Sequence, residues 1–219
     1  MLTLFTSGST DEPKQITHSW KYINECADAS IKEIGLTDKD KVLDVFPANT
    51  IAHYSITSYP AQRVGAQLLS SNFNPYSYIE NFKKFNPTVI SLIPKHLELL
   101  KSTKGFANLD MSSVRYMVTG SSKIDQEFID AFTSKGVKTV ANWYGMTELP
   151  PPIFVGYNTP EFDLTTIDQN RHHIMFMPAG GYSGNLQQCY INGKATGDLF
   201  EMSPCQFAQR IKQSNRDTW

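Results

Sequence analysis

The chain has 219 residues, and its 20 lysines and arginines against 21 aspartates and glutamates leave a formal charge of −1 with neutral histidines. This balance argues against a surface built to bind nucleic acid, and the three cysteines are too scattered for a disulfide framework or a zinc site. No stretch approaches the roughly 20 apolar residues of a membrane span and no export signal is visible, so we expect a globular protein of the cytoplasm.

Short β-branched runs alternate with amphipathic helical patterns through the middle of the chain. Apolar residues at steps of three and four predict a helix over 20–34 that ends at Gly35. Pro94 opens a second helix, and a third runs from Asp125 to Gly136. Strands are predicted over 42–46, 67–70, 88–93, 114–119 and 137–141. The alternation indicates βαβ units, and therefore an α/β fold with a largely parallel, covered sheet.

After Pro150 the pattern changes to short alternating stretches, 153–155, 173–176 and 188–191, separated by glycine and proline. These stretches predict a smaller antiparallel β region. We therefore expect an α/β core over 1–150, a β region over 151–205 and a hinge-like tail over 206–219. A loop-like polar run near the start and a polar tail without helix or strand signal make both ends look cut from something longer.

A hydroxyl-rich segment near the start is suited to binding an anion. Hydroxyl side chains surround Gly8, which lets backbone N–H groups approach closely, and Lys14 adds a charge on a flexible stem. The segment is not a Walker A loop, because the Gly-Lys-Ser/Thr ending is missing. The alternative is a solvated turn.

Further polar segments follow predicted strands, where ligands of parallel sheets bind. Gly120-Ser121-Ser122 follows one strand, and 142–148 follows the next with an aromatic ring, a hydroxyl and a carboxylate suited to Mg²⁺. Thr196-Gly197-Asp198 offers a carboxylate for ribose hydroxyls. Each alone also fits an ordinary turn with a packed ring or a hairpin turn.

Taken in order, Thr-Ser-Gly-Ser-Thr-Asp-Glu-Pro-Lys, Tyr-Gly-Met-Thr-Glu and Thr-Gly-Asp resemble the motifs of the adenylate-forming superfamily of acyl-CoA synthetases, luciferases and non-ribosomal peptide synthetase adenylation domains. The resemblance implies that a small carboxylic acid reacts with ATP and Mg²⁺ to give an acyl-adenylate and pyrophosphate. It further implies transfer of the acyl group to coenzyme A or to the pantetheine of a carrier protein.

The resemblance also implies roles for the matching residues. The β and γ phosphates would be held by Thr6, Ser7, Gly8, Ser9, Thr10 and Lys14. Thr147 would contact the α phosphate, Glu148 would bind Mg²⁺, and Pro47 and His53 would lie beside the substrate carboxylate. The adenine and acyl sites would be lined by Gly120, Ser121 and Ser122. The remaining contacts to the nucleoside would come from Asn142, Tyr144 stacked on adenine, Gly145, and Asp198 and Arg210 on the ribose.

The family's C-terminal domain supplies a catalytic lysine that no residue here matches. We therefore expect adenylation to be weak or to depend on a separately encoded C-terminal domain. An apolar flank that an N-terminal segment covers in the family predicts a homodimer. Two alternatives stay open: a catalytically inactive module that binds nucleotide or protein, and a different phosphotransfer enzyme, for which no general base is evident. The adjacent His172 and His173 would point to opposite faces of a strand, so we expect no metal there.

Overall fold

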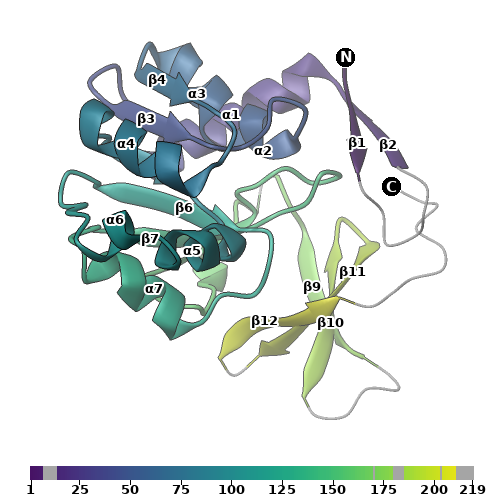
Figure 1. Cartoon of the computed structure of the whole chain (residues 1–219). Helices are drawn as coiled ribbons and strands as arrows, with labels where there is room; N and C mark the ends of the chain where they lie inside the picture. Colours follow the sequence, from purple (N-terminus) through teal and green to yellow (C-terminus); the bar gives the residue numbers. More distant parts are fainter. Residues whose placement is uncertain (7–13, 170, 180–184, 203, 211–219) are drawn as a thin grey trace.

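The computed structural model describes residues 1–6, 14–169, 171–179, 185–202 and 204–210, and only the backbone of Thr6 and Arg210. A six-stranded sheet, in the order β4-β3-β5-β6-β7-β8, forms the centre of the molecule (Figure 1). Its strands are β3 (Lys41–Asp44), β4 (Gln67–Ser70), β5 (Val89–Ser91), β6 (Tyr116–Gly120), β7 (Val140–Tyr144) and β8 (Phe154–Tyr157). All neighbours pair in parallel except β7 and β8, which confirms the predicted α/β fold.

Helices cover both faces of this sheet. Their bounds are α1 (Trp20–Ile34), α2 (Ile51–Ser55), α3 (Ser58–Val64), α4 (Pro75–Phe85), α5 (Pro94–Lys101), α6 (Lys104–Ala107) and α7 (Gln126–Thr133). One core packs α4, α5, α6 and α7 against the sheet around Phe82 and Phe132, and the other packs α1 and α3 around Ile34 and Val89. Parallel strands buried on both faces explain the continuous apolar runs in the sequence.

Gly35 ends α1 and Asp125 caps α7 as predicted, whereas α7 ends at Thr133, before the predicted Gly136. Ser19 accepts a hydrogen bond from the backbone N–H of Tyr22 at the start of α1, and Gly35 ends the helix in the left-handed conformation at φ 61°. Asp125 accepts from the N–H of Phe128 as the N-cap of α7. These caps satisfy backbone groups that the helix itself leaves unpaired.

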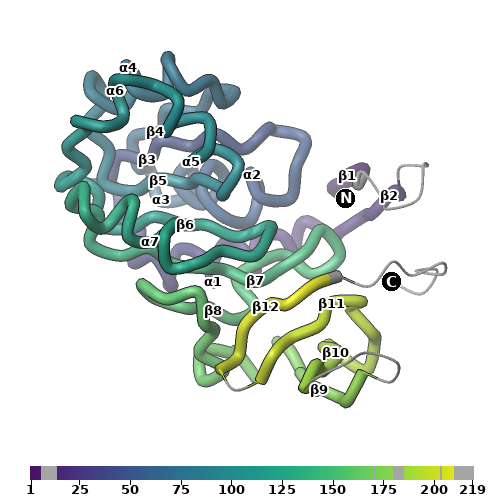
Figure 2. The backbone as a smooth tube through the Cα atoms, turned by 60° about the horizontal axis from the view of Figure 1, so that its bottom comes forward, coloured from purple at the N-terminus to yellow at the C-terminus, as the bar shows by residue number. Residues whose placement is uncertain are grey.

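A second, four-stranded antiparallel sheet has the order β12-β11-β10-β9. Its strands are β9 (Ile174–Pro178), β10 (Leu186–Ile191), β11 (Lys194–Met202) and β12 (Cys205–Arg210), preceded by the short 3₁₀ helix η1 (Leu164–Thr166). It packs beside the β7–β8 edge of the large sheet, as Figure 2 shows, through an aromatic cluster that includes Tyr144, Phe154 and Phe200. The smaller antiparallel region is therefore confirmed.

Several predictions about single elements are wrong. The stretch 153–155 was expected in the smaller region, but β8 pairs with β7 in the large sheet. The strand predicted over 137–141 begins three residues later, so Asn142 and Tyr144 lie within β7 and not in a loop after it. Likewise Asp198 lies inside β11 and not at a strand end or a turn.

Two strands flank the hydroxyl-rich segment near the start, where the sequence predicted only a loop-like run. They are β1 (Leu2–Thr6) and β2 (Lys14–His18), paired antiparallel as a separate two-stranded sheet. The inward-facing Leu2, Leu4 and Ile16 are buried, and Leu2 and Leu4 cluster with Ile23 of α1 and Ile51 of α2. The sequence also predicted no helix or strand from Arg210 onward, but Arg210 is the last residue of β12. Among the described helices, none is long and apolar enough to cross a membrane.

Candidate functional site

A cavity of about 660 Å³ lies at the carboxyl edge of the large sheet. This edge is where ligands of parallel α/β sheets bind, because the loops that leave neighbouring strands converge there. The described residues that line the cavity are Leu4, Phe5, Phe46, Pro47, Asn49, Thr50, Ile51, Ala52, Ile56, Ile93, Thr119, Gly120, Ser121, Trp143, Gly145, Met146, Thr147, Glu148 and Pro151. Its wall is thus largely apolar on the side of β1 and α2, and polar beside β6 and the loop after β7.

Gly120 is required where β6 leaves the sheet. A Cβ atom built on Gly120 would lie 2.4 Å from the backbone oxygen of Trp143, so no side chain fits between β6 and β7. Ser121 follows with φ 70°, in the left-handed region, and turns the chain over the cavity. Ser121 lines the cavity, whereas the exposed Ser122 is not among the lining residues.

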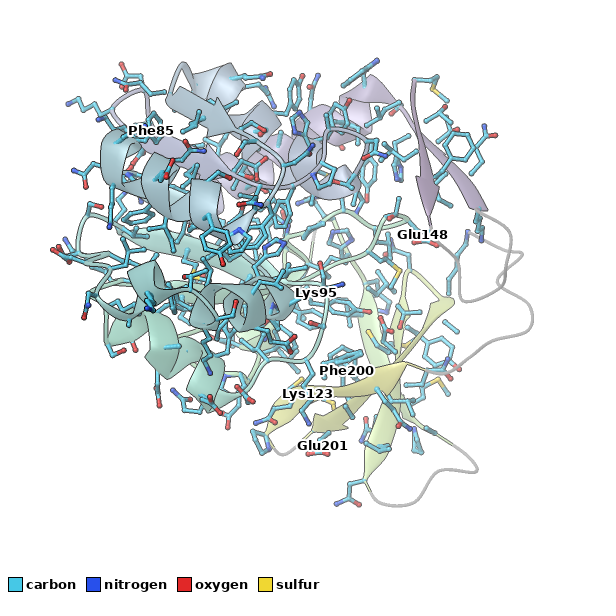
Figure 3. All side chains as sticks on the ribbon, viewed as in Figure 1. Phe85, Lys95, Lys123, Glu148, Phe200 and Glu201 are labelled. Atoms are coloured by element: carbon cyan, nitrogen blue, oxygen red, sulfur yellow. The ribbon has the colours of Figure 1, made fainter. Side chains whose placement is uncertain are left out.

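A tight turn after β7 presents Thr147 and Glu148 to the cavity. The N–H groups of Met146 and Leu149 donate to each other's carbonyl oxygens, at 2.9 and 3.1 Å. A Cβ on Gly145 would lie 2.6 Å from Cβ of Pro151, so the predicted glycine is needed for packing. Glu148 lies in the loop that reaches toward the β1–β2 hairpin (Figure 3).

His18 anchors this turn, although no pattern in the sequence singled it out. Its Nε2 atom donates a 2.7 Å hydrogen bond to the carbonyl oxygen of Thr147, and its ring lies 5.4 Å from that of Tyr22. The end of β2 and the start of α1 are thereby fixed against the loop that carries Glu148. A lone histidine at the end of a short strand has no pattern that could have predicted this contact.

Asp44, also missed, is a fully buried carboxylate at the end of β3. Its oxygens accept hydrogen bonds from the hydroxyls of Thr57, Ser58 and Ser91, at 2.7, 2.5 and 2.7 Å, and from the N–H of Phe46. Four donors compensate for the loss of hydration of a buried charge. Since Phe46 and Pro47 follow directly and line the cavity, Asp44 holds one wall of the site in place. An acid inside the apolar run Val-Leu-Asp-Val-Phe is the signal that could have identified it.

His53 was predicted beside the substrate carboxylate, but it is not among the lining residues. Its Nδ1 lies 3.8 Å from Oδ2 of Asp44 and, within the described part of the chain, has no hydrogen-bond partner. The side chain of His53 is only 16% exposed. Thr50 and Ala52 of the same segment line the cavity instead.

Tyr144 and Asp198, predicted to hold the nucleoside, are brought together but buried. The Tyr144 hydroxyl donates to Oδ2 of Asp198 at 2.7 Å. Its ring stacks on Phe154, with centroids 4.5 Å apart and 10° between planes, and meets the edge of Phe200. Burial and the charge of Asp198 raise the pKa of Tyr144 well above 10, so the hydroxyl stays a donor. Neither residue lines the cavity among the described residues.

The other predicted residues are placed as follows. The Asn142 side chain is buried and donates through Nδ2 to the carbonyl oxygen of Pro160, at 3.1 Å. Lys14 opens β2, and Thr6 ends β1. Ser7, Gly8, Ser9 and Thr10 lie outside the described residues, as does the side chain of Arg210.

The donor set suits Mg²⁺ bound together with phosphates better than a metal held by protein alone. Glu148 is the one carboxylate among the described lining residues, and no group of three or more histidine, cysteine or acidic side chains in the described chain could hold a metal ion. Mg²⁺ commonly binds through one or two carboxylates together with substrate phosphates. Glu148 therefore fits a metal that arrives with a nucleotide.

The chain is similar to known proteins over most of its length. The family model for AMP-binding enzyme matches residues 1–176. The chain is 24% identical over 149 residues to the long-chain-fatty-acid–CoA ligase FadD13 of Mycobacterium tuberculosis, covering 68% of this chain and 29% of that protein. It is 27% identical over 157 residues to the indoleacetate–CoA ligase of Aromatoleum aromaticum, covering 69% and 30%.

Solved structures show the same fold. The O-succinylbenzoate coenzyme A synthetase of Bacillus subtilis in complex with ATP and magnesium ion superposes with a TM-score of 0.75 at 19% identity, covering 95% of this chain and 49% of that one. The chain thus spans less than a third of the length of the curated relatives described above. Because the family model covers most of the chain, including the loops that line the cavity, this protein belongs to the AMP-binding enzyme family of adenylate-forming enzymes.

Proposed function

We propose that this chain carries the nucleotide and acid site of an AMP-forming acid–CoA ligase. The observation that supports the proposal most directly is the cavity at the carboxyl edge of the sheet, where Gly120, Thr147 and Glu148 meet. Its volume of about 660 Å³ lies within the roughly 300–1,000 Å³ of small-molecule sites. The apolar side, with Phe46 and Ile93, would receive the body of the acid.

In the proposed reaction a carboxylate oxygen of the acid bonds to the α phosphorus of ATP. The bond from that phosphorus to the oxygen bridging to the β phosphate breaks, and pyrophosphate leaves with the electron pair. Thr147 would donate a hydrogen bond to the α phosphate, where charge develops. Mg²⁺, when bound at Glu148, would offset the charge of the phosphates.

A thioester-forming step would follow. The sulfur of coenzyme A, or of a carrier's pantetheine, bonds to the acyl carbon while the bond to the AMP oxygen breaks, and the thiol proton passes to solvent. The proposal keeps the roles predicted from the sequence for Lys14, the hydroxyl-rich segment 6–10, His53, Asn142 and Arg210. It also includes a small carboxylic acid as the substrate and a separately encoded C-terminal domain or carrier protein as a partner. The protein would act as a homodimer in the cytoplasm.

One observation favours a second candidate, a nucleotide-binding module without catalytic activity. The carboxylate of Asp198 is fully buried and already accepts the hydroxyl of Tyr144, and aromatic rings pack around Tyr144. Ribose and adenine could reach these residues only if the aromatic cluster shifts. Such a site would bind nucleotide weakly and would not support catalysis.

Two measurements on the same preparation distinguish these functions. Calorimetric titration with AMP and with ATP plus Mg²⁺ tests the site, and exchange of labelled pyrophosphate into ATP with a panel of aliphatic and aromatic carboxylic acids tests the reaction. Binding with acid-dependent exchange supports the ligase, and binding without exchange supports the inactive module. No heat with either nucleotide at millimolar concentration would contradict both.

A further inference from the structure

A second cavity, of about 420 Å³, lies on the other side of the Glu148 loop. It is enclosed by β2, the first turn of α1, the loop before β9 and the β10–β11 turn. The described lining residues are Gln15, Ile16, Thr17, His18, Tyr22, Glu148, Leu149, Arg171, Asn192 and Lys194. Glu148 lines both cavities, so a ligand in one lies next to a ligand in the other.

The cavity is rich in hydrogen-bond donors, two of which carry a permanent positive charge. Arg171 and Lys194 supply the charges, and the hydroxyl of Tyr22 adds a donor, because burial raises the pKa of Tyr22 to about 12. Glu148 is the one acid in the described lining. An anion is therefore the class of ligand that matches this lining.

Arg171 is the lining side chain whose hydrogen-bond donors most clearly lack suitable acceptors among the described residues. Its Nη2 donates to the sulfur of Cys26 at 3.2 Å, a weak acceptor, and no described carboxylate lies within ion-pair distance. Its Nε atom is buried and, in the described part of the chain, has no hydrogen-bond partner. A charged donor without an acceptor destabilises a protein, and a planar guanidinium fork fits two phosphate oxygens.

The presence of Glu148 decides which anion fits. A carboxylate ligand would be repelled by Glu148, whereas a phosphate chain can share a divalent cation with it. We propose that this second cavity is a subsite for a diphosphate group, held by Arg171 and Lys194 and facing Glu148. The inference rests on the proposed function, in which pyrophosphate is released beside Glu148; the diphosphate of coenzyme A has the same chemistry.

Calorimetry on the full chain with Mg²⁺ tests the subsite, using inorganic pyrophosphate and coenzyme A as separate probes. We expect Arg171→Gln to weaken pyrophosphate binding about tenfold or more, as loss of a charge-assisted pair predicts, and Lys194→Gln to weaken it about threefold. The matched control is Arg63→Gln, an arginine of α3 that pairs with Asp28 at 2.8 Å. Lys194 is exposed, so its variant tests the subsite even if the Arg171 variant does not fold.

AMP provides the arm that separates this inference from the proposed function. AMP affinity should stay unchanged in both variants, and pyrophosphate should bind equally well to AMP-saturated protein, because the two occupy different cavities. Failure of AMP to bind would contradict the proposed function. If AMP binds but neither substitution changes the affinity for pyrophosphate, the subsite alone is overturned. The same holds if AMP abolishes the binding of pyrophosphate.

The coenzyme A probe identifies the source of the diphosphate. If coenzyme A displaces pyrophosphate and its own binding weakens about tenfold in Arg171→Gln, the subsite takes the diphosphate of the coenzyme. If coenzyme A leaves pyrophosphate in place, the subsite takes the pyrophosphate product. Either result supports a diphosphate site on Arg171.

Discussion

The hydroxyl of Tyr144 and the carboxylate of Asp198 form a buried 2.7 Å hydrogen bond between β7 of the large sheet and β11 of the small one. Asp198 is in turn held through its N–H, which donates to Thr196 Oγ1 at 3.1 Å. This bond joins the two sheets through the residues that the sequence assigned to adenine and ribose. The predicted nucleoside residues are therefore part of the interface between the two sheets.

Tyr144→Phe should therefore lower the free energy of unfolding. The substitution leaves the ring packing intact but removes one donor from the fully buried Asp198, which we expect to cost about 1–3 kcal/mol. Urea unfolding followed by fluorescence measures the change. Tyr190→Phe is the matched control, because the Tyr190 hydroxyl makes a longer 3.3 Å bond to Gln188 in the same small sheet; equal losses in both variants would contradict the linking role of Tyr144.

Glu148→Gln should reduce the effect of Mg²⁺ on ATP binding. With Mg²⁺ we expect ATP affinity to fall about tenfold, because the variant loses the carboxylate that a hard cation prefers, whereas AMP affinity without metal should hardly change. Titrations with and without Mg²⁺ measure both. Glu127→Gln, at a largely exposed glutamate paired with Lys101, should behave like the wild type, and a Mg²⁺ response that survives in Glu148→Gln would show that Glu148 is not the ligand.

Gly120→Ala should destabilise the sheet at the edge of the cavity. The new methyl would lie 2.4 Å from the Trp143 carbonyl oxygen, a backbone atom that moves only if β6 and β7 separate, so we expect a loss of about 1–3 kcal/mol. Thermal unfolding measures it. Gly105→Ala is the control, because its Cβ would meet only the Ile79 side chain at 3.3 Å; a loss as large as that of Gly120→Ala would contradict the backbone clash.

Asp44→Asn should be more damaging than its conservative shape suggests. All four groups bonded to Asp44 donate to its oxygens, and an amide nitrogen would face one of them as a second donor. We expect a loss of about 2–4 kcal/mol and weaker acid binding, since the wall at Phe46 loosens. Asp28→Asn, at a mostly exposed carboxylate, should change stability by under about 1 kcal/mol.

The lowered pKa of Asp40 predicts how the stability of the protein depends on pH. Burial alone would raise its pKa, but hydrogen bonds from Arg115, Thr88 and the N–H of Thr37 outweigh burial and lower the pKa to about 2. Since the folded pKa lies below the unfolded value of 3.8, the stabilisation is complete above about pH 5 and is lost as the pH falls toward 2. We expect ionised Asp40 to contribute about 1–2 kcal/mol to the free energy of unfolding, allowing for solvent screening at the partly exposed Arg115.

The measurement is urea unfolding between pH 5 and 2. Asp40→Asn should be less stable than the wild type at pH 5 and should show a flatter decline, because it has no proton to take up at this position. The Asp40–Arg115 pair, with a 2.7 Å contact, joins the residues before β3 and β6, at the edge opposite the cavity. Asp40→Asn should therefore leave AMP binding unchanged, and a decline as steep as that of the wild type would exclude Asp40 as its source.

The sequence alone determined the alternation of helices and strands, the end of α1 at Gly35, the start of α7 at Asp125, and the family motifs. These features are local: caps and apolar periodicity depend on residues a few positions apart, and Gly145 is required by the nearby Pro151. Gly120, in contrast, is required by Trp143 of the neighbouring strand. The Gly-Met-Thr-Glu turn, a motif visible in the sequence, lies at the cavity.

Only the tertiary structure decided which residues meet across long stretches of chain. The Tyr144–Asp198 bond joins residues 54 positions apart, the His18–Thr147 bond joins residues 129 positions apart, and Arg171 reaches the second cavity from a loop with no motif. Strand pairing also placed β8 in the large sheet. The ring of Tyr144 packs in the buried aromatic cluster, because contact with Phe154 and Phe200 removes more apolar surface from water than a loop position would. Such contacts depend on how sheets pack against each other, which linear order does not specify.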